Sequence, residues 1–138
     1  MEQQLVTNMK VLINSSSNKI FESDKVDYIE LPGKAGILGV LNNHEPVIST
    51  LDVGIIRIKE SGKEINLVIN GGFAQIANNN VFILANEAEM QENLVKEEIE
   101  NAIRNAENKI SGKLEPSELI RLEKEIKYQK LKREVSAR

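Results

Sequence analysis

Residues 64–85 read EINLVINGGFAQIANNNVFILA, three short apolar runs separated by Asn-Gly-Gly at 70–72 and Asn-Asn-Asn at 78–80. Asn and Gly suit tight turns because they tolerate a positive φ. Strand-length runs between such turn signals indicate antiparallel β-structure. Similar runs extend back to residue 9, with Pro-Gly and Ser-Gly pairs between them. The sequence therefore predicts an N-terminal antiparallel β-sandwich or barrel over residues 1–88.

The run VFILA at 81–85 is apolar on both of its faces. Side chains alternate along a strand, so Val81, Ile83 and Ala85 point one way. Phe82 and Leu84 point the other way. One set buries against the opposing sheet, and the other set needs a second cover. The C-terminal segment, a partner protein or both would provide that cover.

From about Gln91 the apolar period becomes that of a helix. Ser-Gly-Lys at 111–113 ends this helix, and Pro116 suits the first turn of a second helix that runs to about Val135. Residues 89–138 are therefore predicted to form an antiparallel two-helix hairpin, which makes the fold class α+β. The apolar stripe of the first helix is Val95, Ile99, Ala102, Ile103, Ala106 and Ile110, and the anchors of the second are Leu119, Leu122, Ile126 and Leu131.

This hairpin combines a thin apolar stripe with a basic end. A two-helix unit of fewer than about 50 residues rarely stabilises itself, so the hairpin must pack on the sandwich or on another protein. A cluster of basic residues is by default a solvated helix face. The alternative is a functional basic arm that is only weakly held. The cluster on the second helix is Lys124, Lys127, Lys130, Lys132 and Arg133.

Composition argues against several classes of function. The chain has 138 residues, 41% of them hydrophobic, which suits one average domain, or one small domain with an appendage, that has a core. No cysteine and a single histidine leave little for a metal cage, so no metal or cofactor is expected. Aromatic residues at 4% and a net charge of -3 disfavour nucleic-acid binding.

No apolar run reaches the roughly 18 residues of a membrane span. The opening MEQQLVTNMK lacks the build of a signal peptide, so the chain is expected to stay in the compartment where it is made.

The candidate chemical groups also have plain structural interpretations. His44 lies in GILGVLNNHEP at 36–46, and a catalytic imidazole would need a nucleophile or base partner that no motif here supplies. The stretch LPGKAGILG at 31–39 lacks both phosphate-loop spacings, so its glycines are interpreted as turn glycines. A further set of carboxylates fits the solvated edge of a strand. These carboxylates are Asp24, Asp27 and Glu30.

The order of these pieces resembles the epsilon subunit of F-type ATP synthases. The matching stretches are GILGVLNNHEPVIST (36–50), VINGGFAQIANNNVFILANEAE (68–89) and ENLVKEEIENAIRNAENKI (92–110). The resemblance covers nearly the whole chain. It implies a non-catalytic rotor subunit of the central stalk, held by the gamma subunit and standing on the membrane-embedded ring of c subunits. It also implies a peripheral location at the cytoplasmic face of the bacterial inner membrane, reached only through the complex.

The resemblance also implies which residues contact partners. By matching position, His44 and Ser49 would lie toward gamma. The tip at Gly36, Ile37 and Leu38 would lie toward the c-ring. Many members of the family carry glutamate where this chain has Ile37, so a polar contact with the ring does not carry over to that position.

In the family, the hairpin either folds against the sandwich or extends along gamma and hinders ATP hydrolysis. The basic second helix then faces an acidic segment of the catalytic beta subunit. The resemblance implies that four basic residues make this contact and form a regulatory basic arm. They are Lys124, Lys127, Lys130 and Arg133.

Some bacterial members of the family bind ATP on the folded hairpin through an Ile/Leu-Asp-x-x-Arg-Ala motif. The aligned stretch here starts at Leu94, and Val95 replaces the acid of the motif. Glu98 replaces the arginine and Ile99 replaces the alanine. A glutamate at the arginine position repels phosphate, so weak or no ATP binding is expected.

Two other interpretations remain open at the level of sequence. The chain could be a β-sandwich adaptor with a helical interaction tail, in which case it need not bind gamma. It could also be a small stand-alone enzyme, although no constellation of convergent polar groups supports that interpretation.

Overall fold

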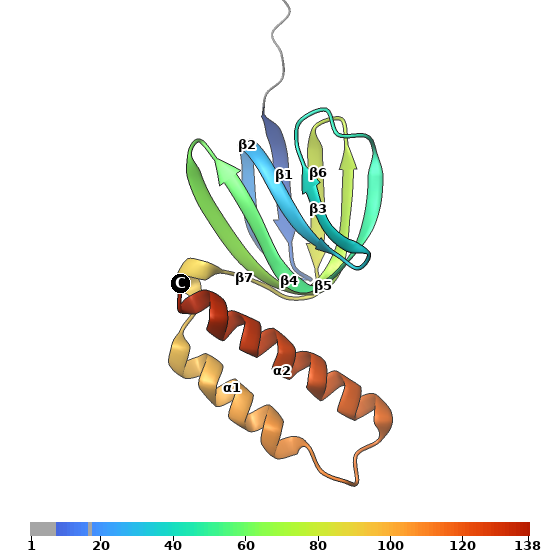
Figure 1. Ribbon diagram of the computed structural model, residues 1–138, viewed down its shortest axis with the longest axis vertical. Helices are drawn as coiled ribbons and strands as arrows, with labels where there is room; N and C mark the ends of the chain where they lie inside the picture. Colours follow the sequence, from blue (N-terminus) through green and yellow to red (C-terminus); the bar gives the residue numbers. More distant parts are fainter. Residues whose placement is uncertain (1–7, 17) are drawn as a thin grey trace, which may run out of the picture.

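A computed structural model describes residues 8–16 and 18–138, and residues 1–7, which include most of the stretch that lacks a signal-peptide pattern, lie outside it. The strands form a barrel, and the two helices lie side by side beneath one end of it, with α2 nearer the strands (Figure 1). The strands are β1 Met9–Asn14, β2 Lys19–Gly33, β3 Gly36–Val40, β4 Val47–Glu60, β5 Lys63–Ala77, β6 Asn80–Ala85 and β7 Ala88–Met90. The helices are the 3-10 turn η1 Gln91–Asn93, α1 Lys96–Lys109 and α2 Pro116–Ser136.

The barrel closes because β1 pairs with both β2 and β6. The sheet order is β1-β6-β5-β4-β2-β3, and the additional β1–β2 pairing makes β1, β6, β5, β4 and β2 a closed ring. A ring with an odd number of strands cannot alternate direction at every step, so one neighbouring pair must be parallel. That pair is β1–β6. The predicted fold class is confirmed, but the expectation of a wholly antiparallel sheet is wrong at this one pair.

The Asn-Gly-Gly stretch at 70–72 is not a turn, contrary to the sequence prediction. Strand β5 runs straight through it and pairs with β4 along nearly its whole length. Its other edge is shared, because one part of β5 pairs with β6 and another with β7. Gly71 and Gly72 have φ values of 75° and 145°, and they let β5 change partner within one strand. The turn signal at 78–80 is confirmed, since Asn78 and Asn79 form the β5–β6 turn with positive φ.

Replacement of Gly72 by alanine is expected to destabilise the barrel strongly. A Cβ at this position would lie 2.2 Å from the carbonyl oxygen of Leu84 and 2.8 Å from the Cα of Ala85. Both contacts are with backbone, so relief requires the β5–β6 pairing to shift. The expected loss in free energy of unfolding is about 3 kcal/mol or more, measured by urea denaturation. Gly62→Ala is the control, because Gly62 also has positive φ but nothing within 4 Å, and it should lose only about 1 kcal/mol. Equal losses would contradict the steric argument.

The first helix begins later than the sequence predicts. Strand β7 and η1 occupy the residues from Ala88 to Asn93, so α1 starts at Lys96 and not near Gln91. Val95 therefore precedes the helix and Ile110 follows it, and both are exposed although they were assigned to the apolar stripe. The boundary proposed between residues 88 and 89 stays a prediction, and β7 lies across it.

Two apolar clusters hold the chain together. The larger one fills the barrel, with 17 buried residues from strands β1 to β6. The smaller one joins the hairpin to the barrel, and its buried members are Val68 of β5 with Tyr128 and Val135 of α2. Of the four predicted anchors of the second helix, Leu122 is buried and the other three are half-buried. The sequence pattern missed Tyr128 and Val135, which make the contact with the barrel.

Candidate protein-docking surface

Four adjacent strands carry apolar side chains on the side that faces away from the barrel interior. Strand register places two rows of residues across β1, β6, β5 and β4. The row between these two contains Ile13, Ile83 and Ala74, which are buried in the core. Because side chains alternate along a strand, the rows on either side of it face outward. The first outward row is Leu12, Phe82, Gln75 and Ile48, and the second is Asn14, Leu84, Phe73 and Thr50. The five apolar members, Leu12, Ile48, Phe73, Phe82 and Leu84, are called the outer apolar face below.

The outer apolar face is open to solvent. Ile48 is 74% exposed, Phe73 40% and Leu84 36%, while Leu12 and Phe82 are half-buried. Helix α2 packs on another part of β4 and β5, where Val53, Ile55 and Val68 join its apolar cluster. Of the covers that the sequence suggested for the second apolar side of VFILA, the C-terminal segment is therefore used elsewhere. The other cover that the sequence suggested is a partner protein.

The residues predicted to face gamma lie beside this surface. Ser49 shares the inward row of Ala74 and is half-buried, and its hydroxyl donates a hydrogen bond to the carbonyl oxygen of Thr50 (3.3 Å). Its neighbours Ile48 and Thr50 are the residues of β4 that face outward.

His44 lies half-buried in the loop at 41–46, where its Nδ1 donates a hydrogen bond to the carbonyl oxygen of Glu45 (2.7 Å). This contact fits a loop-stabilising histidine.

The tip predicted to face the c-ring lies at the start of β3. Gly36 and Ile37 are exposed, Ile37 by 75%, whereas Leu38 is half-buried against the barrel core. Ile37 lines a groove of about 640 Å³ between the barrel and α2, together with Ile126 and Leu131. The structure thus separates Leu38, which packs inward, from Ile37, which is free to contact a partner.

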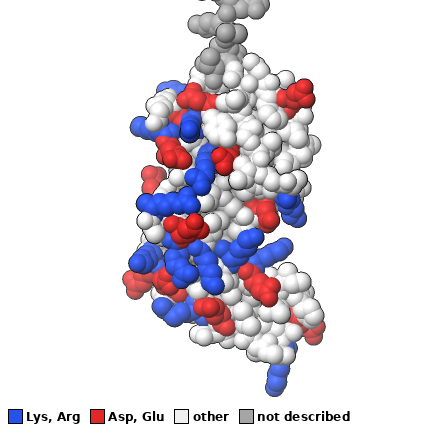
Figure 2. Space-filling model, viewed as in Figure 1, with Lys and Arg blue, Asp and Glu red and all other residues white. Residues whose placement is uncertain are grey.

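The predicted basic arm is divided by the structure. All four side chains are exposed on α2, but among the described residues only Arg133 of the four is recorded in an ion pair, with Glu100 of α1 at 3.4 Å. Basic side chains gather where the hairpin meets the barrel (Figure 2). Lys132 was interpreted as part of the solvated helix face, and this is wrong, because it is only 7% exposed. Helical spacing places it on the same side of α2 as Tyr128 and Val135, which is the side that faces the barrel.

The residues of the altered ATP motif do not form one polar site. Leu94 packs in the cluster between hairpin and barrel, and Ile99 is buried between the helices. Val95 is exposed just before the helix, and Glu98 is exposed in its first turn beside Glu97. Two carboxylates therefore lie next to each other in the first turn of α1.

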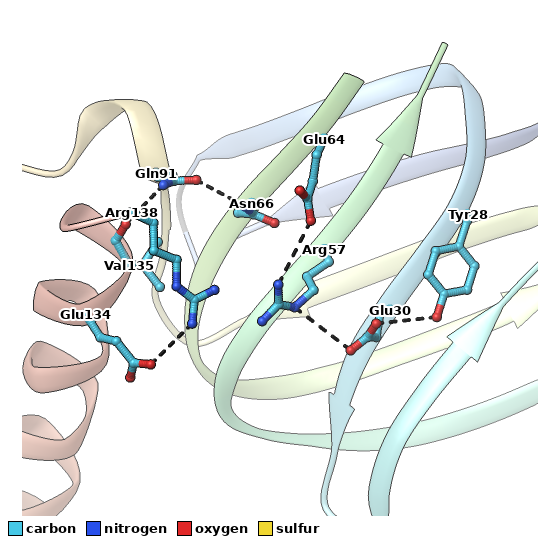
Figure 3. A network of polar contacts seen from close by, with 9 residues as sticks. All are labelled: Tyr28, Glu30, Arg57, Glu64, Asn66, Gln91, Glu134, Val135 and Arg138. Carbon is cyan, nitrogen blue, oxygen red and sulfur yellow. Dashed lines mark hydrogen bonds and ion pairs between the residues drawn. The ribbon is translucent and has the colours of Figure 1, made fainter. Parts of the chain in front are cut away.

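Other polar groups that could suggest chemistry hold the barrel together. Glu30 accepts a hydrogen bond from the hydroxyl of Tyr28 (3.4 Å) and lies 4.0 Å from Arg57, which also reaches Glu64 (Figure 3). Burial raises the pKa of Tyr28, and the charge of Glu30 adds to the rise. The carboxylate of Asp27 accepts hydrogen bonds from the side chain of Asn8 and the backbone of Ser61.

The described part of the chain offers no metal centre and no membrane span. Over residues 8–16 and 18–138, no group of three or more His, Cys, Asp or Glu side chains could hold a metal ion. In the same residues, no helix is long and apolar enough to cross a bilayer. The fold and its surface together define a class of protein, a β-barrel domain with an apolar face open to solvent and a helical hairpin attached to one end.

Comparison with known proteins identifies the family. Residues 8–91 match the family described as ATP synthase, Delta/Epsilon chain, beta-sandwich domain, and the chain belongs to this family. It is 41% identical over 101 residues to the ATP synthase epsilon chain of Pelotomaculum thermopropionicum, covering 73% of this chain and 75% of that one. It is 32% identical over 95 residues to the epsilon chain of Desulforamulus reducens, covering 69% and 72%. The epsilon chain is a non-catalytic subunit of ATP synthase, so the resemblance seen in the sequence is confirmed at the level of family.

A solved structure supports the same fold. The chain is similar to one in a structure of Euglena gracilis mitochondrial ATP synthase (OSCP/F1/c-ring, rotational state 1), with a TM-score of 0.76 and 24% identity. The match covers 95% of this chain and 82% of the other. It therefore includes the helices as well as the barrel.

Proposed function

We propose that this chain is a rotor subunit of an F-type proton-translocating ATP synthase that binds the gamma subunit through its outer apolar face. In this role it couples gamma to the c-ring and performs no chemistry of its own. Two observations support the proposal: the family to which the chain belongs, and an apolar surface that the hairpin leaves open. The second observation carries it, because a soluble domain rarely leaves several large apolar side chains exposed on adjacent strands unless a partner covers them.

The tip of the barrel is proposed as the contact with the c-ring. Ile37 offers an apolar side chain at the start of β3, where many members of the family carry glutamate. Contact there would therefore be made by apolar packing and not by a charge-assisted hydrogen bond. Through this contact the protein would be a peripheral component at the cytoplasmic face of a bacterial inner membrane.

The hairpin is proposed to regulate ATP hydrolysis. In the structure it is folded against the barrel through a small apolar cluster, which permits release at modest cost. Released, it would carry the basic arm of Lys124, Lys127, Lys130 and Arg133 to an acidic segment of the beta subunit. All four side chains are already exposed, and Arg133 would exchange Glu100 for that acidic partner.

Co-purification tests the main proposal. A tagged copy of this chain, expressed in cells that make the whole ATP synthase, should recover gamma in a one-to-one complex that survives gel filtration. The competing interpretation, a general adaptor with a helical tail, predicts other proteins and no gamma. Recovery of the chain without gamma would therefore reject the rotor function.

ATP is expected to bind weakly or not at all to the isolated chain. Val95 and Glu98 occupy the positions where the motif of the family has an acid and an arginine, and Glu98 repels phosphate. Titration calorimetry should show no heat of binding at micromolar ATP. The double variant Val95→Asp/Glu98→Arg tests whether these two replacements are the cause, since it should gain affinity. Micromolar affinity of the unmodified chain would contradict the prediction.

A further inference from the structure

The hairpin is attached to the barrel at one end only. Tyr128 and Val135, in the C-terminal half of α2, are the residues of that helix buried in the cluster shared with the barrel. Nearer the hairpin turn, a cleft of about 930 Å³ separates the helices from the barrel, and it is lined by Ala106 and Leu122 on one side and Thr50 and Phe73 on the other. The contact that holds the hairpin closed is therefore concentrated where α1 begins and α2 ends.

Six residues at this point, called the root cluster, connect three parts of the chain: Asn66, Glu89, Gln91, Tyr128, Lys132 and Val135. The side chain of Gln91 in η1 donates a hydrogen bond to the carbonyl oxygen of Val135 in the last turn of α2 (3.0 Å). Its amide oxygen accepts a hydrogen bond from Asn66 of β5 (3.1 Å). Figure 3 shows Gln91 between these two partners. Barrel, hairpin root and C-terminal helix thus meet through one side chain.

The only buried cation recorded in the described residues belongs to this cluster. Lys132 is 7% exposed, and its ammonium lies 3.5 Å from a carboxylate oxygen of Glu89 in β7. The same ammonium lies 5.0 Å from the centre of the Tyr128 ring, within the range of a cation–π contact. Burial raises the pKa of Tyr128, and the charges of Glu89, Glu87 and Glu125 add to the rise. Tyr128 therefore stays neutral beneath the ion pair.

A buried ammonium is stable only while it keeps a partner. Removing one member of a buried pair leaves an uncompensated charge, whereas replacing both members by apolar groups is often nearly neutral. The carboxylate of Glu89 is 45% exposed, so solvent and competing cations can reach it. The ion pair is thus both necessary for Lys132 to stay buried and open to disruption from outside.

Other buried residues of the hairpin lie between its two helices. Helix α1 buries only Ile99, Ile103 and Ala106. On the facing helix, Gln129 is buried, and its amide oxygen has no hydrogen-bond partner. An unpaired buried oxygen costs free energy, so Gln129 weakens the packing inside the hairpin.

We propose that the ion pair between Glu89 and Lys132, stacked on Tyr128, is the contact that keeps the hairpin closed on the barrel. Its strength sets the fraction of molecules in which α2 has left the barrel. The inference rests on the proposed function for its biological consequence, because release of α2 is what would bring the basic arm to the beta subunit. On release, Lys132 also becomes a fifth cation on that arm.

Hydrogen exchange of the full-length chain, followed by mass spectrometry, tests the proposal. Glu89→Gln should raise the exchange rate of α2 amides in residues 128–136 about tenfold, because the buried ammonium loses its partner. The strands β1 and β6 should exchange as before. Adding Lys132→Met to Glu89→Gln should bring the rate back toward that of the unmodified chain, since no buried charge is then left unpaired. Glu100→Gln is the control, because it removes the ion pair between the helices and leaves the barrel contact intact.

Two results would overturn the proposal: unchanged exchange in Glu89→Gln, or faster exchange in all strands, which would indicate global unfolding. Failure of the rescue by Lys132→Met would also reject a role for the unpaired charge. The proposed regulation is tested separately by ATPase activity of the assembled enzyme. If exchange rises in α2 while the hairpin has no effect on activity, the closing contact stands and the regulatory function fails.

Discussion

A variant that carries Ile48→Glu and Leu84→Glu is expected to lose affinity for gamma by roughly a hundredfold or more. The two residues lie on β4 and β6, one in each row of the outer apolar face, and both are exposed in the isolated chain. Exposed positions accept charge at little cost to folding, so the barrel should keep its stability. In a complex the same carboxylates would be buried without partners, which is costly. Calorimetric titration with purified gamma gives the dissociation constant directly.

The matched control for this variant is Ile120→Glu. Ile120 is an exposed isoleucine too, 55% exposed, but it lies on α2, outside the outer apolar face. The Ile120→Glu variant should bind gamma with the affinity of the unmodified chain. All variants should have the same midpoint of urea unfolding, because none of the substitutions affects the barrel core. Equal affinity for gamma in the double variant and the control would place the gamma contact elsewhere on the molecule.

The second prediction concerns the basic arm. Replacing Lys124, Lys127, Lys130 and Arg133 together by glutamine is expected to raise ATP hydrolysis by the assembled enzyme about three- to tenfold at low salt. An exposed charge pair contributes up to about 1 kcal/mol, and in the proposed extended state four such pairs would hold the arm against beta. Salt screens such pairs, so the difference between variant and unmodified enzyme should shrink as ionic strength rises.

Its control replaces four exposed lysines of the barrel. Lys10, Lys19, Lys25 and Lys63 are all exposed, and changing them to glutamine alters the net charge by the same amount. This control should leave hydrolysis unchanged. If the arm variant also hydrolyses ATP at the unmodified rate at low salt, the arm does not inhibit through its charge.

Much of the fold follows from the sequence pattern. The alternation of apolar runs and turn signals predicted the strands, and the change to a helical period with Pro116 at a helix start predicted the hairpin. The parallel β1–β6 pair could not be predicted, because it depends on closing the ring and not on any local signal. Asn-Gly-Gly at 70–72 has the composition of a turn, yet pairing of β5 with β4 carries the strand through it.

The candidate site was predictable in part. The apolar residues on both sides of VFILA indicated a second surface in need of cover, and Phe82 and Leu84 do belong to it. Whether the hairpin covers these two side chains depends on where α2 packs on the barrel. Tyr128 and Val135 make that contact, and neither is among the predicted anchors of the second helix. Lys132 illustrates the same limit. A lysine in a basic cluster predicts a solvated side chain, and only the packing of α2 on Val68, whose register partner is Glu89, buries it.

Because the chain contains no cysteine, a single introduced thiol can report whether gamma covers the outer apolar face. The measurement is the rate of maleimide labelling of Ile48→Cys, with and without bound gamma, beside Ile120→Cys. We predict that gamma slows labelling at position 48 by more than about tenfold and leaves position 120 unchanged. Equal labelling at position 48 in the free chain and in the gamma complex would contradict the docking surface described here.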